Sequence, residues 1–178
     1  MANQAIELAK QFDKFDEKKE AGVSLYAKRH YNITSNLGHA IGVSYIGALL
    51  TIAGADGELA EDEINWLIEE QRLFSSAPKE VLDQLAEFIR KFDWRSADLD
   101  SLLKDLKYDF PINIKHKLIY QAIKMSHADR NYHKKELKAV WKAAGTLGVP
   151  KDIVIALENL VNIESSLDKM RHALLGTA

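Results

Sequence analysis

The 178-residue sequence contains no cysteine and only three prolines. Without cysteine, disulfide scaffolds, thiolate zinc sites, iron–sulfur clusters and thiol catalysis are excluded. The sequence also lacks a glycine-rich phosphate-binding loop, a serine nucleophile elbow, a His-Glu-x-x-His motif and a dinucleotide fingerprint. We therefore expect no enzyme activity and no organic cofactor. A metal would have to be held by carboxylates, imidazoles or carbonyl groups.

Residues 37–55 carry no Asp, Glu, Lys or Arg over about the length that crosses a bilayer. Polar residues and four glycines dilute the hydropathy of this stretch, which favours a packed central helix over a transmembrane segment. The first residues show neither the charged region nor the apolar run of an export signal. We expect a cytoplasmic protein without a transmembrane segment.

An internal repeat organises the middle of the chain. Residues 49–64 are echoed by residues 122–137, and Pro78-Lys79-Glu80-Val81 is echoed by Pro150-Lys151-Asp152-Ile153. Each copy predicts a helix, a short acidic loop, a second helix and a helix that starts at proline. We predict a single all-α domain over residues 1–178, a bundle of about eight helices with pseudo-twofold symmetry. The copies span about 37–90 and 111–160, between an N-terminal helix and a long C-terminal helix.

The C-terminal helix is predicted to carry a heptad seam, with apolar residues that alternate spacings of three and four. These residues are Ile153, Ala156, Leu160, Ile163, Leu167, Met170 and Leu174. The N-terminal helix has a shorter version in Ala5, Leu8, Phe12 and Phe15. One hypothesis is that both termini pack on the repeat core or on each other. The other is that the C-terminal helix forms a homodimer or binds a protein partner.

The candidate chemistry lies in the pattern Ala-Asp-x6-Glu, which occurs at Asp56 with Glu63 and again at Asp129 with Glu136. Each Glu falls in the first turn of a helix, where capping is its ordinary role. Each Asp falls at the end of a helix, where the backbone dipole opposes a negative charge. Two explanations remain open for these aspartates: hydrogen bonds to the following amides, or a bound hard cation.

In the cation hypothesis the metal ligands are Asp56, Glu63, Asp129 and Glu136, with Glu58, Glu61 and Asp62 as auxiliary oxygen donors. Ca²⁺ or Mg²⁺ suits these donors best, and Zn²⁺ or Mn²⁺ is not excluded. The spacing is not that of an EF-hand, because Gly57 follows Asp56 directly. We expect Gly57 to supply a positive φ as the chain leaves the helix.

The second loop is less acidic than the first, because it contains Arg130, Lys134 and Lys135. His127 and His133 could join Asp129 and Glu136 in a transition-metal site, although a histidine at a helix end is more often a cap. Lys134, Lys138 and Lys142 share one helix face, and such a stripe is usually solvated. We do not expect nucleic acid as a partner.

Two short stretches resemble a known family. They are Ala53-Gly54-Ala55-Asp56-Gly57 with Glu63, and Ser126-His127-Ala128-Asp129 with Glu136 ahead of Leu147-Gly148-Val149. Over about residues 37–157 the chain resembles the TerB-like tellurite-resistance proteins, which include a domain of a membrane-anchored DnaJ-type co-chaperone. The resemblance implies an all-helical bundle whose acidic residues gather on one face and bind a divalent cation. It leads us to expect a stress-associated scaffold for protein partners, or alternatively a metal-free helical interaction module.

Overall fold

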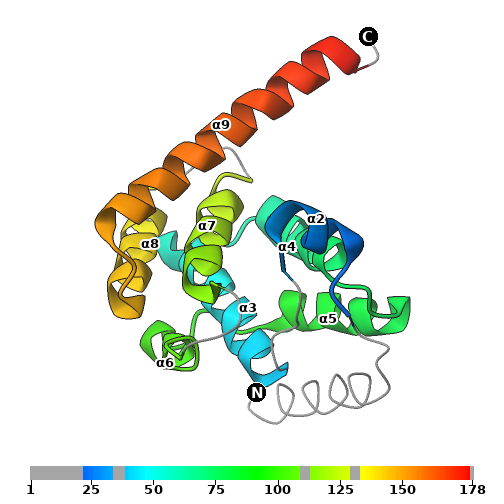
Figure 1. Ribbon diagram of the computed structural model, residues 1–178. Coiled ribbons are helices and arrows are strands. Elements are labelled where there is room, and N and C mark those ends of the chain that lie inside the picture. The colour runs from blue at the N-terminus through cyan, green and yellow to red at the C-terminus, as the bar shows by residue number, and fades with distance from the viewer. Residues whose placement is uncertain (1–21, 34–38, 109–112, 129–132, 177–178) are drawn as a thin grey trace.

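The computed structural model of the protein describes residues 22–33, 39–108, 113–128 and 133–176 (Figure 1). Those residues form eight α-helices and one 3-10 turn, with no strand beyond an isolated bridge between Val23 and Ser75. The elements are α2 Leu25–Tyr31, α3 His39–Ala53, η1 Gly54–Asp56, α4 Glu61–Phe74, α5 Lys79–Lys91, α6 Leu99–Lys104, α7 Ile114–Ser126, α8 Lys134–Leu147 and α9 Lys151–Leu175. The all-α prediction is confirmed. The predicted N-terminal helix with Ala5, Leu8, Phe12 and Phe15 lies outside the described residues.

Helices α3 and α7 form the centre of the fold, and the other helices pack around them (Figure 1). Leu49 and Leu50 on α3 and Leu118 and Ile119 on α7 are completely buried in one continuous core. This explains why residues 37–55 are apolar: α3 is covered by α6, α7 and α5. Within the described residues, no helix combines the length and the apolarity that a membrane crossing requires.

The order of helices is the same in the two halves of the described chain. In the first half α3 leads through η1 to α4 and then α5, and in the second α7 leads through a loop to α8 and then α9. Pro78 is the N-cap of α5 and Pro150 is the N-cap of α9, where the fixed φ of proline suits the start of a helix. These positions follow the sequence repeat described above.

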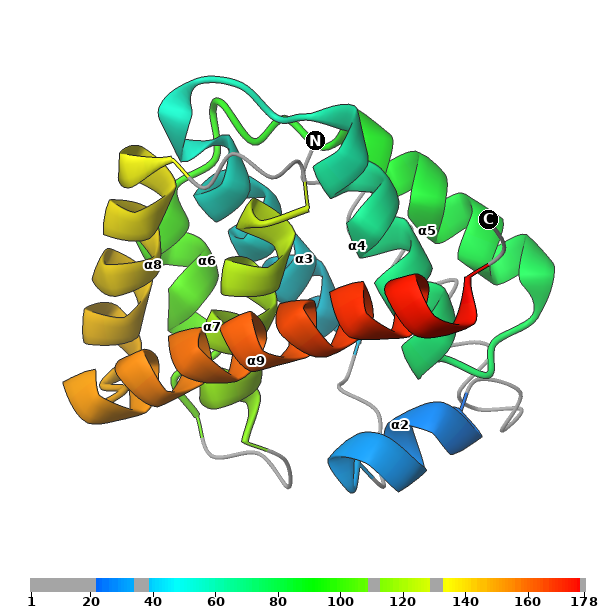
Figure 2. The same ribbon diagram turned by 90° about the horizontal axis from the view of Figure 1, so that it is seen from above.

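Helix α9 is a single 25-residue helix that extends beyond the body of the protein (Figures 1 and 2). Its first half packs on α7 and α8, with Val154 and Val161 buried. Further along the helix, Ile163 and Met170 are 58% and 57% exposed, whereas Leu160 and Leu167 line a groove shared with α2 and α7. The predicted packing of the two termini on each other falls outside the described residues, so it stays a prediction.

Helix α2 joins the body through a small second cluster, in which Val23, Ala27, Ile33 and Phe74 are buried together. The Ser24 amide donates to the Phe74 carbonyl over 2.9 Å, and the Ser24 hydroxyl donates to the Leu73 carbonyl. These bonds cap the end of α4 and start α2. As a result α2 lies beside α4, across a groove from α9 (Figure 2).

Candidate functional site

Helix α8 packs against η1 and α3, which brings the first acidic loop beside α8. The Lys135 ammonium on α8 donates a 3.1 Å hydrogen bond to the backbone carbonyl of Asp56 at the end of η1. Carbonyl groups at a helix end carry partial negative charge, which a lysine stabilises. We call this place, defined by Asp56, Gly57, Glu58 and Lys135, the loop junction.

The backbone of the first loop is fixed by two glycines. Gly54 is buried under the ring of Trp94, and a Cβ there would lie 2.4 Å from a ring carbon, so only glycine allows this approach. Gly57 has a φ of 108°, the positive value that the sequence predicts. Its amide donates to the Gly54 carbonyl over 3.0 Å and closes the turn.

Asp56 is half-buried and its side chain turns toward the amides that follow it. Oδ1 accepts a 2.9 Å hydrogen bond from the Glu58 amide, which is an Asx turn. In the described part of the chain, no partner is found for Oδ2. One carboxylate oxygen of Asp56 therefore stabilises the turn.

Glu63 and Glu136 occupy equivalent places in α4 and α8. Both side chains are buried, at 2% and 4% exposure. The Glu63 carboxylate accepts from the Ala60 amide over 2.8 Å, and the Glu136 carboxylate accepts from the His133 amide over 2.7 Å. This is the capping contact that the spacing predicts, and it places a negative charge at the positive end of each helix. The two glutamates therefore hold the loops in position.

The auxiliary acids of the first loop are exposed. Glu61 forms an ion pair with Arg90 of α5, with 2.5 Å between Oε1 and Nη1, so one of its oxygens is already engaged. Glu58 and Asp62 remain on the exposed surface of the first loop and the start of α4. They are the auxiliary acids that could still supply oxygens to a cation near Asp56.

The second loop includes Asp129, which lies outside the described residues together with Arg130. His127 ends α7 as its C-cap, and His133 is the exposed N-cap of α8. Both histidines therefore lie at helix ends, as their spacing predicts. Considering only described residues, no group of three or more His, Asp or Glu side chains is arranged to hold a metal.

A groove of about 880 Å³ runs between α2, α7 and α9. At its floor the Tyr120 hydroxyl donates to the Glu164 carboxylate, 2.8 and 2.7 Å from its two oxygens. Lys124 lies 3.3 Å from the same carboxylate, which completes a polar cluster between α7 and α9. Burial and the adjacent carboxylate raise the pKa of Tyr120, so its phenol stays protonated.

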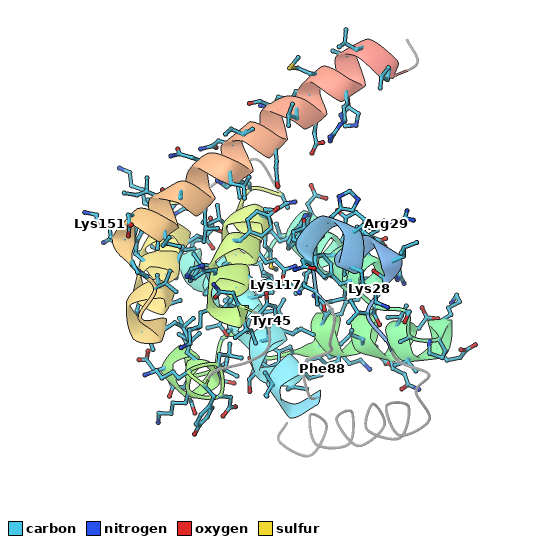
Figure 3. All side chains as sticks on the ribbon, in the orientation of Figure 1. Lys28, Arg29, Tyr45, Phe88, Lys117 and Lys151 are labelled. Atoms are coloured by element: carbon cyan, nitrogen blue, oxygen red, sulfur yellow. The ribbon has the colours of Figure 1, made fainter. Side chains whose placement is uncertain are left out.

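Lys117 lies along the same groove and faces aromatic rings. Its Nζ is 4.1 Å from the centre of the Phe74 ring and 5.7 Å from that of Tyr45. Lys117 and Tyr45 are labelled near the centre of the molecule in Figure 3. Burial lowers the pKa of Lys117 from 10.5 to about 8, and the charge of Glu70 opposes this shift. Glu70 is itself buried and accepts from Gln121 over 3.0 Å, while Gln121 accepts from the Tyr45 hydroxyl over 2.6 Å.

The sequence model of the tellurite resistance protein TerB matches residues 71–159, which is half of the chain. The chain belongs to the TerB family. The matched region begins within α4 and ends within α9, so it contains Asp129 and Glu136 and starts after Asp56 and Glu63.

A solved structure supports the TerB fold over a longer range. The crystal structure of a tellurite resistance protein from Nostoc punctiforme superposes with a TM-score of 0.66 at 22% identity, covering 85% of this chain and 91% of that one. At this identity the similarity establishes the fold. No curated protein sequence matches the chain significantly.

Sequence reasoning missed two features of this TerB chain. It treated Lys135 only as a loss of acidity, although Lys135 occupies the repeat position of Asp62 and reaches across to the other copy. The sequence signal for this contact was the difference in charge at the equivalent position, which is Asp62 in one copy and Lys135 in the other. It also missed the cluster at Tyr120, Lys124 and Glu164, because no sequence spacing links α7 to α9. The basic stripe of α8 is a solvated face as expected, with Lys142 paired to Asp100 at 2.9 Å.

Proposed function

We propose that this TerB-family chain is a non-enzymatic, cytoplasmic protein of the tellurite and stress response that binds one divalent cation at the loop junction and serves as a scaffold for a protein partner. Asp56 and Asp129 are the principal carboxylate ligands, and Glu58 and Asp62 are further oxygen donors. Glu63 and Glu136 hold the two loops through their capping bonds. Ca²⁺ or Mg²⁺ suits such oxygen donors.

The observation that carries this proposal is the hydrogen bond from Lys135 to the Asp56 carbonyl. This bond brings the first turn of α8, which is distant in sequence, to the end of the first loop, at a point of negative potential. The end of η1, the Asp56 carboxylate and the exposed Glu58 all contribute to that potential. Lys135 supplies one positive charge there, and a divalent cation would supply two.

The alternative function is a metal-free helical module for protein interactions. The same contacts favour it, because the Asx turn satisfies one oxygen of Asp56 and Lys135 satisfies its carbonyl. In that case the aspartate stabilises the turn and needs no ion. The two functions differ in how the stability of the protein responds to metal.

Thermal unfolding in EDTA and then in excess Ca²⁺, Mg²⁺, Mn²⁺ or Zn²⁺ separates them. A cation that binds only the folded state raises the free energy of unfolding by about 2.7 kcal/mol at a hundredfold excess over its Kd. We expect Asp56→Asn to abolish this gain and to leave stability in EDTA unchanged or slightly higher, since repulsion at the helix end is relieved. An equal loss of stability in EDTA and in metal would favour the metal-free module.

Lys135→Met gives a sharper test, because it removes a competing charge without touching a ligand. One unit charge held about 6 Å from a divalent ion in water opposes its binding by about 1.4 kcal/mol. The variant should therefore bind the cation about tenfold more tightly. Lys138→Met, further along α8, is the matched control and should bind like the parent protein. An unchanged or weaker affinity in Lys135→Met would contradict a cation at the loop junction.

A further inference from the structure

The groove between α2, α7 and α9 has a volume of about 880 Å³, which is in the range of small-molecule sites. Leu157, Leu160 and Leu167 of α9 line one side of it, and Tyr26 and Tyr31 of α2 line the other (Figure 2). Leu160 and Leu167 remain 43% and 44% exposed, so the groove is open to solvent along α9. Its lining shares no residue with the loop junction.

The acidic side chains that line the groove are already paired. Glu164 accepts from the Tyr120 hydroxyl and lies 3.3 Å from the Lys124 ammonium. Asp168 forms an ion pair with Arg171, with 2.6 Å between Oδ1 and Nη1. These two acids therefore balance the charges of Lys124 and Arg171, and they leave the other lysine of the groove, which lies on α7, without a counter-charge.

That lysine is Lys117. Among the described residues, no carboxylate lies within ion-pair distance of its ammonium, which faces the rings of Phe74 and Tyr45 instead. Its side chain is half-buried in the α7 wall of the groove. Glu70 attracts this charge, but Glu70 is itself buried and accepts from Gln121. The described groove therefore carries an excess positive charge at Lys117.

An ammonium in this position lowers the stability of the fold. Burial lowers the pKa of Lys117 to about 8, because the charged form loses its water there. A methionine would fill similar space without that penalty. A side chain that lowers stability is typical of a functional site, where stability is exchanged for the binding of a ligand. The residue type at this position is therefore better explained by a ligand than by the fold.

We propose that the groove binds a small amphipathic monocarboxylate such as a fatty acid. Its carboxylate lies at the Lys117 ammonium, and its apolar body lies between the leucines of α9 and the tyrosines of α2. A single ammonium is a point charge that suits one negative charge. The arginine fork that favours phosphate is not free in this lining, because Arg171 is paired with Asp168. The apolar walls supply affinity by removing the ligand's hydrocarbon from water.

Calorimetric titration of octanoate, octanol and octylammonium into the full chain tests the proposal, because these probes share one apolar chain and differ in charge. We expect one octanoate per chain, bound about tenfold or more tightly than octanol, which is the contribution of a charge-assisted hydrogen bond. Octylammonium should bind more weakly than octanol, because Lys117 repels it. Equal binding of the three probes, tighter binding of octylammonium, or no saturable binding of octanoate up to a few millimolar would overturn the proposal.

Lys117→Met locates the carboxylate of the ligand. The variant keeps a side chain of similar length and an apolar groove, so octanol should bind at least as well as to the parent protein, whereas octanoate should lose its advantage over octanol. Lys115→Met, on the same helix but outside the groove lining, is the matched control and should keep that advantage. If octanoate kept its advantage in Lys117→Met, its carboxylate would not lie at Lys117 and the proposal would be wrong.

Leu167→Glu tests the apolar wall, because it places a negative charge on the α9 side of the groove. This variant should bind octanol more weakly than the parent protein and octanoate more weakly still. Ile155→Glu, at an exposed position of α9 that does not line the groove, is the matched control and should bind both probes like the parent protein. Circular dichroism checks that both variants remain folded. Unchanged binding of octanoate in folded Leu167→Glu would place the ligand outside the groove and contradict the proposal.

Discussion

Replacing Lys117 with methionine removes a positive charge from the edge of the core and leaves a side chain of similar length. The lysine is desolvated between Phe74 and Tyr45, so its charged form is less stable there than in the unfolded chain. A pKa lowered from 10.5 to about 8 means that, at neutral pH, desolvation of the charged lysine destabilises the folded state by about 3 kcal/mol. The attraction of the ammonium to the two rings offsets about 1 kcal/mol of this destabilisation. We therefore expect Lys117→Met to raise the free energy of unfolding at pH 7 by about 2 kcal/mol.

The lowered pKa of Lys117 also predicts that the stability difference between the two proteins depends on pH. Between about pH 8 and 10.5 the unfolded chain binds a proton at Lys117 that the folded chain has lost, so the stability of the parent protein rises with pH in that window. The variant lacks this group, and its advantage should shrink steadily as the pH increases from 8. The tyrosines of both proteins ionise alike and cancel in the difference.

Urea unfolding followed by tryptophan fluorescence at pH 7, 8, 9 and 9.5 measures this difference directly. Lys115→Met, on the same helix, is the matched control and should change the free energy of unfolding by no more than about 0.5 kcal/mol at any pH. If Lys117→Met destabilised the protein equally at all four pH values, the ammonium would be net stabilising and the argument from desolvation would be refuted.

Two further predictions concern the loops. Gly57→Ala introduces no clash, but it forces a residue with a side chain into a φ of 108°. We therefore expect the free energy of unfolding to fall by about 1 to 2 kcal/mol and the melting temperature to fall by a few degrees. An unchanged melting temperature would mean that the turn relaxes. Glu136→Ala removes the carboxylate that caps His133 and should cost about 2 kcal/mol in urea unfolding, whereas Glu136→Gln keeps an acceptor and should cost less than half of that. Equal losses in the two Glu136 variants would argue against the capping role.

Local features of the fold could be predicted from the sequence because they depend on neighbouring residues. The positive φ of Gly57 follows from a glycine directly after a helix end, and the capping bonds of Glu63 and Glu136 follow from their spacing. Prolines 78 and 150 marked the starts of α5 and α9 correctly. The short helices α2 and α6 were not identified individually, because one or two turns carry too little periodicity.

Features that depend on packing could not be predicted in this way. Periodicity shows that α9 has a seam, but it does not say which element covers that seam, and the structure buries another face instead. The bond from Lys135 to Asp56 joins residues that are far apart in the chain, and it arises only when α8 packs against η1. The burial of the polar residues Glu70 and Gln121 could not be predicted either, since it depends on contacts between α4 and α7.

The most direct test of the central claim is calorimetric titration of Ca²⁺ or Mg²⁺ into EDTA-treated protein. A cation at the loop junction predicts saturable binding of one ion per chain, lost in Asp56→Asn and tightened in Lys135→Met. The absence of saturable heat up to millimolar metal, or the same binding curve in Asp56→Asn as in the parent protein, would contradict it.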